Sequence, residues 1–168
     1  YNCDTALIQD NRLDYVGGDG VSIDNVNASI ISGNTISNIN SNGVEVDNSS
    51  SGRNTTLTGN TITGCNYNGV DIQNTNSLLE GNDDGVYLRS YSDDPSWDSL
   101  QNNTIINNID NGVEVRDYSQ AVVQYNNIYG NGDYDLANYS SIYDEMDARY
   151  NFWGETTTSA MEAGGNPK

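Results

Sequence analysis

The chain has 168 residues, of which 35% are hydrophobic, and 6 Lys and Arg residues face 24 Asp and Glu residues, a formal net charge of −18. A field of this sign repels nucleic acid and anionic membrane surfaces, so neither is expected as a partner, whereas Ca²⁺ is. No stretch approaches the roughly 18 apolar residues that span a membrane, so no membrane insertion is expected. The chain contains no His, so any chemistry depends on carboxylates, Tyr, Arg or Lys.

Two short phrases alternate along the chain and define an internal repeat. A Gly-Val phrase occurs as "DGVSI" (19–23), "NGVEV" (42–46), "NGVDI" (68–72), "DGVYL" (84–88) and "NGVEV" (111–115). An Asn phrase occurs as "IISGNTI" (30–36), "LTGNTI" (57–62), "LQNNTI" (100–105) and "VQYNNI" (123–128). The repeated Asn, taken at 11, 34, 60, 82, 103, 127 and 151, advances 140 residues in six steps, a mean of about 23. A period of this length is typical of a solenoid.

The apolar residues inside each repeat follow a period of two. Val44 and Val46 point to one side of a predicted strand, and Glu45 and Asp47 point to the other. A unit of about 23 residues cannot bury its inner face alone, but coils stacked about 4.8 Å apart can. We therefore predict two inner columns of stacked side chains: Val21, Val44, Val70, Val86 and Val113, and next to them Ile23, Val46, Ile72, Leu88 and Val115.

The repeated Asn is interpreted as structural. An Asn amide at a corner both donates to and accepts from the copies above and below it. Asn34, Asn60, Asn103 and Asn127 are therefore predicted to form a ladder of hydrogen bonds between coils.

The "NNTI" and "NGVEV" coils, followed by "ARYNFWG" (148–154), resemble the right-handed parallel β-helix of the pectate-lyase-like superfamily. The resemblance is closest to NosD-like and other secreted or surface β-helix repeat proteins. It implies an all-β chain, with residues 1–168 forming a single right-handed parallel β-helix of about six to seven coils, nearly without helix. It also implies an extracellular or cell-surface location. The superfamily includes lyases, glycosidases, epimerases, adhesins and scaffolds, so the fold does not determine an activity.

One coil, within residues 77–100, departs from the repeat. Gly normally follows the repeated Asn by nine residues, but Gly85 follows Asn82 by only three, so six residues are missing. The next connection, "RSYSDDPSWDSL" (89–100), contains Pro95 and three Asp residues. Loops that depart from a regular scaffold often carry function, so this coil is the first place to look for a site.

Outward positions of the Gly-Val strands bring acidic and basic residues onto one face. They align as Ser22, Glu45, Asp71, Tyr87 and Glu114, with Asp24, Asp47, Gln73, Arg89 and Arg116 beside them. The resemblance implies two chemistries for such a face: a lyase that uses Ca²⁺ with an Arg or Lys base, or a hydrolase that uses a carboxylate pair. If the chain is an enzyme, the catalytic residues would be Glu45, Asp71, Glu114 and Arg116. A solvated acidic face would contain the same residues.

Two further sites are expected around the irregular coil. Tyr87, Tyr91 and Trp97, with Arg89, would form a platform on which sugar rings stack. Hard oxygen ligands for Ca²⁺ would come from Asp83, Asp84, Asp93, Asp94 and Asp98. Five Asn-x-Ser/Thr sequences, at Asn27, Asn48, Asn54, Asn102 and Asn138, are compatible with a glycoprotein.

The favoured function is an extracellular or cell-surface module, structural or carbohydrate-contacting, without complete catalytic machinery. The alternatives are a polysaccharide lyase or glycoside hydrolase, and a subunit of an end-to-end filament. The start shows no capping helix, and the tail at 154–168 is too short to predict as a cap. We therefore expect other copies, or neighbouring β-helix domains of a longer chain, to cover the ends.

Overall fold

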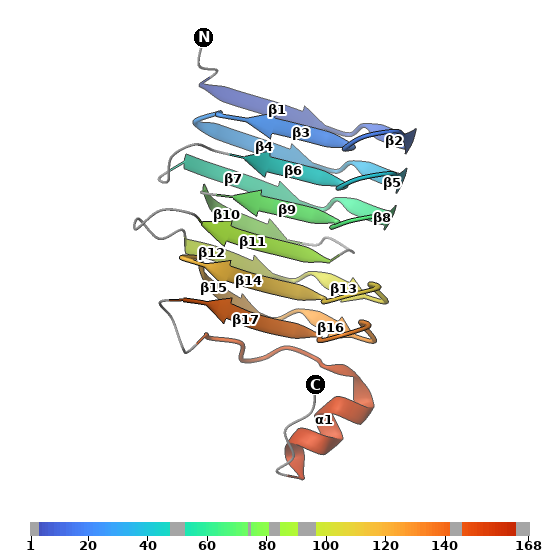
Figure 1. Cartoon of the computed structure of the whole chain (residues 1–168), viewed down its shortest axis with the longest axis vertical. Helices are drawn as coiled ribbons and strands as arrows, with labels where there is room; N and C mark the ends of the chain where they lie inside the picture. The colour runs from blue at the N-terminus through green and yellow to red at the C-terminus, as the bar shows by residue number, and fades with distance from the viewer. Residues whose placement is uncertain are drawn as a thin grey trace.

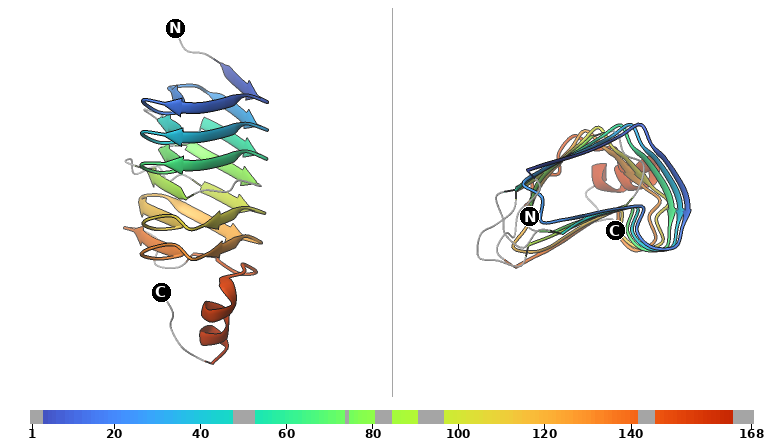
Figure 2. Two further views of the ribbon diagram at one scale, coloured as in Figure 1. Left: turned by 90° about the vertical axis from the view of Figure 1, so that its right-hand side faces the viewer. Right: turned by 90° about the horizontal axis from the view of Figure 1, so that it is seen from above.

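The computed structural model describes residues 4–47, 53–73, 75–80, 85–90, 97–141 and 146–163, and it is a right-handed parallel β-helix. Coils stack along the long axis, with the N-terminus at one end and helix α1 (Gly154–Glu162) at the other (Figure 1). Seen along that axis, the coils superimpose on one another (Figure 2). The fold class predicted from the repeat is therefore confirmed.

Each regular coil contributes one strand to each of three faces. The first face has the order β1 (Thr5–Gln9), β4 (Ala28–Ser32), β7 (Arg53–Thr58), β10 (Thr75–Glu80), β12 (Trp97–Gln101) and β15 (Gln120–Gln124). The second has β3 (Val21–Asp24), β6 (Val44–Asp47), β9 (Val70–Gln73), β11 (Val86–Ser90), β14 (Val113–Asp117) and β17 (Leu136–Ser140). The short third face has β2 (Arg12–Val16), β5 (Thr35–Ile39) and β8 (Thr61–Cys65) in one sheet, and β13 (Thr104–Ile106) and β16 (Asn127–Tyr129) in another.

The solenoid makes about five turns, slightly fewer than the six to seven coils predicted. Beyond β17 the chain leaves the regular stack. It touches the last coil through two isolated bridges, Val122 with Asp147 and Asn127 with Phe152, and then enters α1.

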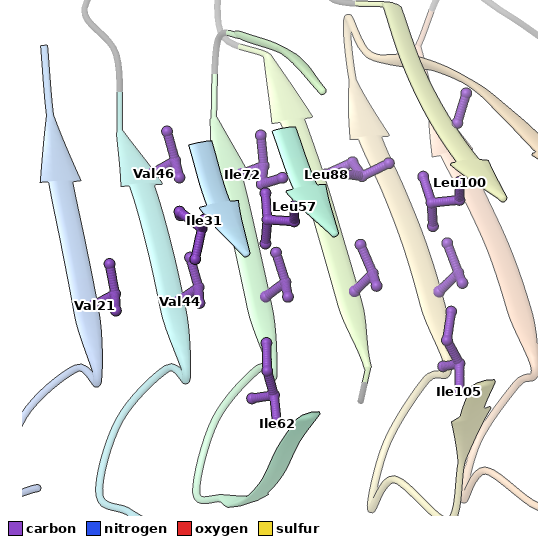
Figure 3. Close-up of a cluster of buried hydrophobic side chains, with 14 of the residues drawn as sticks. Val21, Ile31, Val44, Val46, Leu57, Ile62, Ile72, Leu88, Leu100 and Ile105 are labelled. Carbon is purple, nitrogen blue, oxygen red and sulfur yellow. The ribbon is translucent and has the colours of Figure 1, made fainter. Parts of the chain in front are cut away.

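The predicted inner columns are confirmed by the strand register. Val21, Val44, Val70, Val86 and Val113 are paired in sequence across β3, β6, β9, β11 and β14, and the second column pairs in the same way. All ten side chains are buried. Inward residues of the other faces, such as Ile31, Leu57 and Ile62, complete the core between them (Figure 3). Period-two burial on stacked strands therefore accounts for the fold.

The Asn ladder is present, but one predicted member is wrong. Asn34 Nδ2 donates to Asn60 Oδ1 at 2.9 Å, and Asn103 Nδ2 donates to Asn126 Oδ1 at 3.0 Å. Asn126, and not Asn127, occupies the ladder and is buried, whereas Asn127 is exposed in β16. The physical reason is the corner conformation. The residue before each ladder Asn has a left-handed backbone, as at Gly33, Gly59 and Tyr125, and this places Asn126 at the corner.

The nine-residue helix α1 lies in a tail for which the sequence predicts no cap. Glu155 in its first turn complements the positive end of the helix dipole. Trp153, just before α1, packs against the core, and Phe152 meets Tyr129 edge-on with ring centroids 5.7 Å apart. The tail is thus attached to the last coil by aromatic contacts. Among the described residues, no helix has the length and apolarity needed to cross a membrane.

Candidate functional site

The third face is interrupted at the irregular coil. In the coil before it, eleven residues, 59–69, connect β7 to β9 and include β8. In the irregular coil only five residues, 81–85, connect β10 to β11, which is the six-residue difference seen in the sequence. The third face is accordingly divided into the sheets β2-β5-β8 and β13-β16 (Figure 1). Both main faces continue through this coil without a break.

A groove of about 730 Å³ lies at this interruption. Its walls are residues 64–69, at the end of β8 and in the turn after it, and residues 107–111, in the turn after β13. Strands of the second face supply Val86, Tyr87, Glu114, Arg116 and Tyr139, and the turns before β11 and β17 supply Gly85 and Asp133. We call this the interruption groove. Its volume lies in the range of natural ligand pockets, roughly 300–1,000 Å³.

Three tyrosines line the groove and keep accessible surface. Tyr67 is 75% exposed and Tyr139 is 48% exposed, while Tyr87 is half-buried. The guanidinium of Arg116 lies over the Tyr139 ring, 5.0 Å from its centroid, and Arg89 lies 5.4 Å from the centroid of Tyr87. Rings held in this way against cations have restricted orientations. The groove therefore offers aromatic surfaces beside amide and hydroxyl groups.

A charged cluster is built on β14 and on the turn before it. Arg116 Nε donates a hydrogen bond to Glu114 Oε1, and Asn111 Nδ2 donates to Glu114 Oε2. The hydrogen bond to Glu114 is the main cause that raises the pKa of Arg116. A guanidinium stabilised in its protonated form is a poor general base. In this cluster Arg116 is therefore not suited to abstracting a proton.

The predicted carboxylate pair lies outside the groove lining. Glu45 and Asp71 are register neighbours on β6 and β9, and Tyr87 and Glu114 continue the same column. Asp71 is only 8% exposed, and burial raises its pKa although Arg89 acts in the opposite direction. The pKa of Glu45 is also raised, first by burial and then by Asp19 and Asp71. The structure thus separates the four predicted catalytic residues into two pairs: Glu45 with Asp71, and Glu114 with Arg116.

The predicted Ca²⁺ ligands are mostly beyond the described residues. Asp83, Asp84, Asp93 and Asp94 lie outside them, as does Tyr91 of the predicted sugar platform. Trp97 begins β12, and its side chain is likewise outside the description. Asp98 is 4% exposed and lies on the inner side of β12, as Leu100 does. In the part of the chain that the structure describes, no three acidic, Cys or His side chains converge as a metal site requires.

Sequence reasoning did not find several groove residues, among them Tyr67, Asn111 and Tyr139. Tyr67 lies in the turn before a Gly-Val phrase, where no repeated residue type marks it, and Asn111 opens such a phrase, where the repeat does not distinguish it from the Asn or Asp of the other coils. Tyr139 lies on β17, opposite Arg116 of β14. The sequence of β17, "LANYS", lacks the Gly-Val phrase. The nine-residue spacing from Asn103 to Gly112 could have located the 107–111 turn. Only the strand register between β14 and β17 places Tyr139 beside Arg116.

Comparison with known proteins agrees with this architecture. A family model described as a right-handed beta helix region matches residues 1–151. No curated protein and no solved structure matches the chain significantly.

Proposed function

We propose that this chain, which belongs to the right-handed β-helix family, is an extracellular or cell-surface module that binds a glycan in the interruption groove. The observation that carries the proposal is the groove itself. It lies between the third-face sheets β2-β5-β8 and β13-β16, where only five residues connect β10 to β11, and three tyrosines line it.

The lining chemistry supports a sugar as the ligand. Sugar rings present apolar faces that stack on aromatic rings, and hydroxyl edges that hydrogen-bond to amides and carboxylates. The groove combines Tyr67 and Tyr139 with the amide side chains of Asn66, Asn68 and Asn111. A nucleic acid is a poor alternative, since the chain carries a formal net charge of −18.

The same geometry favours binding over catalysis. Arg116 is held by Glu114, and the buried carboxylate of Asp71 does not line the groove. The module therefore holds a glycan without cleaving it.

The proposal is tested with a glycan array, followed by isothermal titration of the sugars that bind. Two exposed tyrosines provide a matched pair: Tyr67 in the groove is 75% exposed, and Tyr15 on a regular coil is 80% exposed. Tyr67→Ala should weaken binding by about tenfold, as expected for the loss of one aromatic contact. Tyr15→Ala should leave the affinity unchanged. Equal losses in both variants, or an array without any binding, would refute the groove as the site.

A glycoside hydrolase or polysaccharide lyase is the second candidate function, favoured by the raised pKa values of the neighbouring Glu45 and Asp71. A carboxyl with a raised pKa is the usual form of a general acid. The test is incubation with acidic and neutral polysaccharides, with and without Ca²⁺, followed by assay of reducing ends and unsaturated uronates. Product that disappears in Asp71→Asn would favour the enzyme and displace the binding module.

A further inference from the structure

We infer that the interruption groove selects neutral over acidic sugars, and that Glu114 enforces this choice by neutralising Arg116. The inference rests on the proposed function, because it names the class of glycan that the same groove would take. It follows from the placement of charges around the groove.

Carboxylates outnumber cations in the described lining. Asp110, Glu114 and Asp133 carry negative charge, and Arg116 is the single Lys or Arg among the described lining residues. A carboxylated sugar in this groove would therefore face more like charges than opposite ones. Juxtaposed like charges disfavour binding strongly, and most strongly at low ionic strength.

Arg116 is already engaged within the protein. Its Nε donates to Glu114, and its guanidinium lies over Tyr139. The Glu114 side chain is 12% exposed, against 47% for that of Arg116, and it also accepts a hydrogen bond from Asn111. The carboxylate is thus fixed from two sides and partly withdrawn from water, which strengthens its hold on the guanidinium.

The nearby cation Arg89 does not change this balance. It is the register neighbour of Arg116 and lies over Tyr87, but it is absent from the groove lining. Its charge interacts favourably with the buried carboxylate of Asp71. Each of the two arginines on this face therefore has an acidic counterpart nearby.

Removing the charge of Glu114 should remove most of the preference for neutral over acidic sugars. In Glu114→Gln the guanidinium of Arg116 would lose its ion pair and become available to a ligand carboxylate. Arg forms strong two-point hydrogen bonds with carboxylates. The variant should then bind uronate oligosaccharides, while the tyrosines and amides that contact a neutral sugar remain.

The experiment uses paired probes of equal length: galactan and galacturonan, mannan and mannuronan, and glucan and glucuronan oligosaccharides. Affinities are measured without Ca²⁺ at about 20 mM and about 300 mM salt, which changes the screening length several-fold. The native chain should bind a neutral probe at least about tenfold more tightly than its acidic counterpart at low salt, and this ratio should shrink at high salt. Glu114→Gln should raise the ratio of uronate to neutral-sugar affinity by about tenfold at low salt.

Two controls make the result specific. Asp24→Asn removes the same charge from an exposed position on β3, on the same face but away from the groove, and it should change neither affinity. Glu114→Gln combined with Arg116→Gln should lose the gain in uronate affinity. Melting curves verify that each variant is folded.

The outcomes separate this inference from the proposed function. Native protein that binds a uronate as tightly as its neutral counterpart, or a folded Glu114→Gln variant without gain, would overturn the charge selection alone. Absence of binding to either member of every pair would overturn the glycan-binding proposal, and this inference with it.

Discussion

The first three coils and the fourth coil share one core but differ in their outer surface. In the coils that contain β2, β5 and β8, every turn has three strands, whereas the described residues of the next coil form only the two strands β10 and β11. The inner columns nevertheless continue through it. Val86 and Leu88 are as buried as Val70 and Ile72 of the coil before. The two main faces therefore maintain the stack, and the third face can be interrupted to form a groove.

The largest expected effect concerns the shared core. Ile72→Ala in the regular coil and Leu88→Ala in the interrupted coil should each lower the free energy of unfolding by about 2–5 kcal/mol, since both leave a cavity in a closed core. Urea denaturation measures both. A much smaller loss for Leu88→Ala would mean that the interrupted coil is not an integral part of the stack.

The corner ladder offers a comparison between consecutive residues. Asn126 Nδ2 donates to the carbonyl of Leu100 and to Asn151 Oδ1, and Asn126 Oδ1 accepts from Asn103. Asn126→Ala should cost about 1–3 kcal/mol of unfolding free energy, because buried polar groups lose their partners. The exposed Asn127 is the control, and Asn127→Ala should change stability by less than about 0.5 kcal/mol. Similar losses for the two variants would contradict the ladder as assigned.

The smallest effects expected are in the pH dependence of stability. Burial raises the pKa of Asp71 above its ordinary value of 3.8, so just above that value the folded state binds more protons than the unfolded state. Stability should consequently fall as pH rises through this window, and Asp71→Asn should flatten the slope. Thermal melts between pH 4 and pH 7 measure it. An unchanged slope in Asp71→Asn would contradict the burial argument.

Asp147 at the C-terminal corner should show the opposite sign. Hydrogen bonds from Arg149 and Gln124 hold its pKa well below 3.8. These hydrogen bonds therefore stabilise the folded state fully above the ordinary pKa of 3.8, and this stabilisation is lost as pH falls through the lower pKa of Asp147 in the folded state. Asp147→Asn should therefore reduce the loss of stability on acidification. A variant that loses as much stability on acidification as the native chain would show that this carboxylate does not contribute.

The sequence predicted the features that periodicity controls. Alternation in "GVEV" placed Val44 inside and Glu45 outside, and the repeat then predicted the columns on every coil. It failed at Asn127, because two consecutive Asn residues fit the phrase and only the corner backbone distinguishes them. It located the irregular coil but not its groove. A void depends on the turns that surround it, and Tyr67 and Asn111 lie in such turns.

The central claim is that a glycan binds in the interruption groove, and not on coil surfaces away from it. Backbone amide NMR during titration with the neutral oligosaccharides tests it most directly, because each residue reports separately. We predict saturable shifts at Tyr67, Asn111 and Tyr139, and none at Tyr15 or Asp24. Shifts confined to residues outside the interruption groove, or no shifts at saturating sugar, would contradict the account.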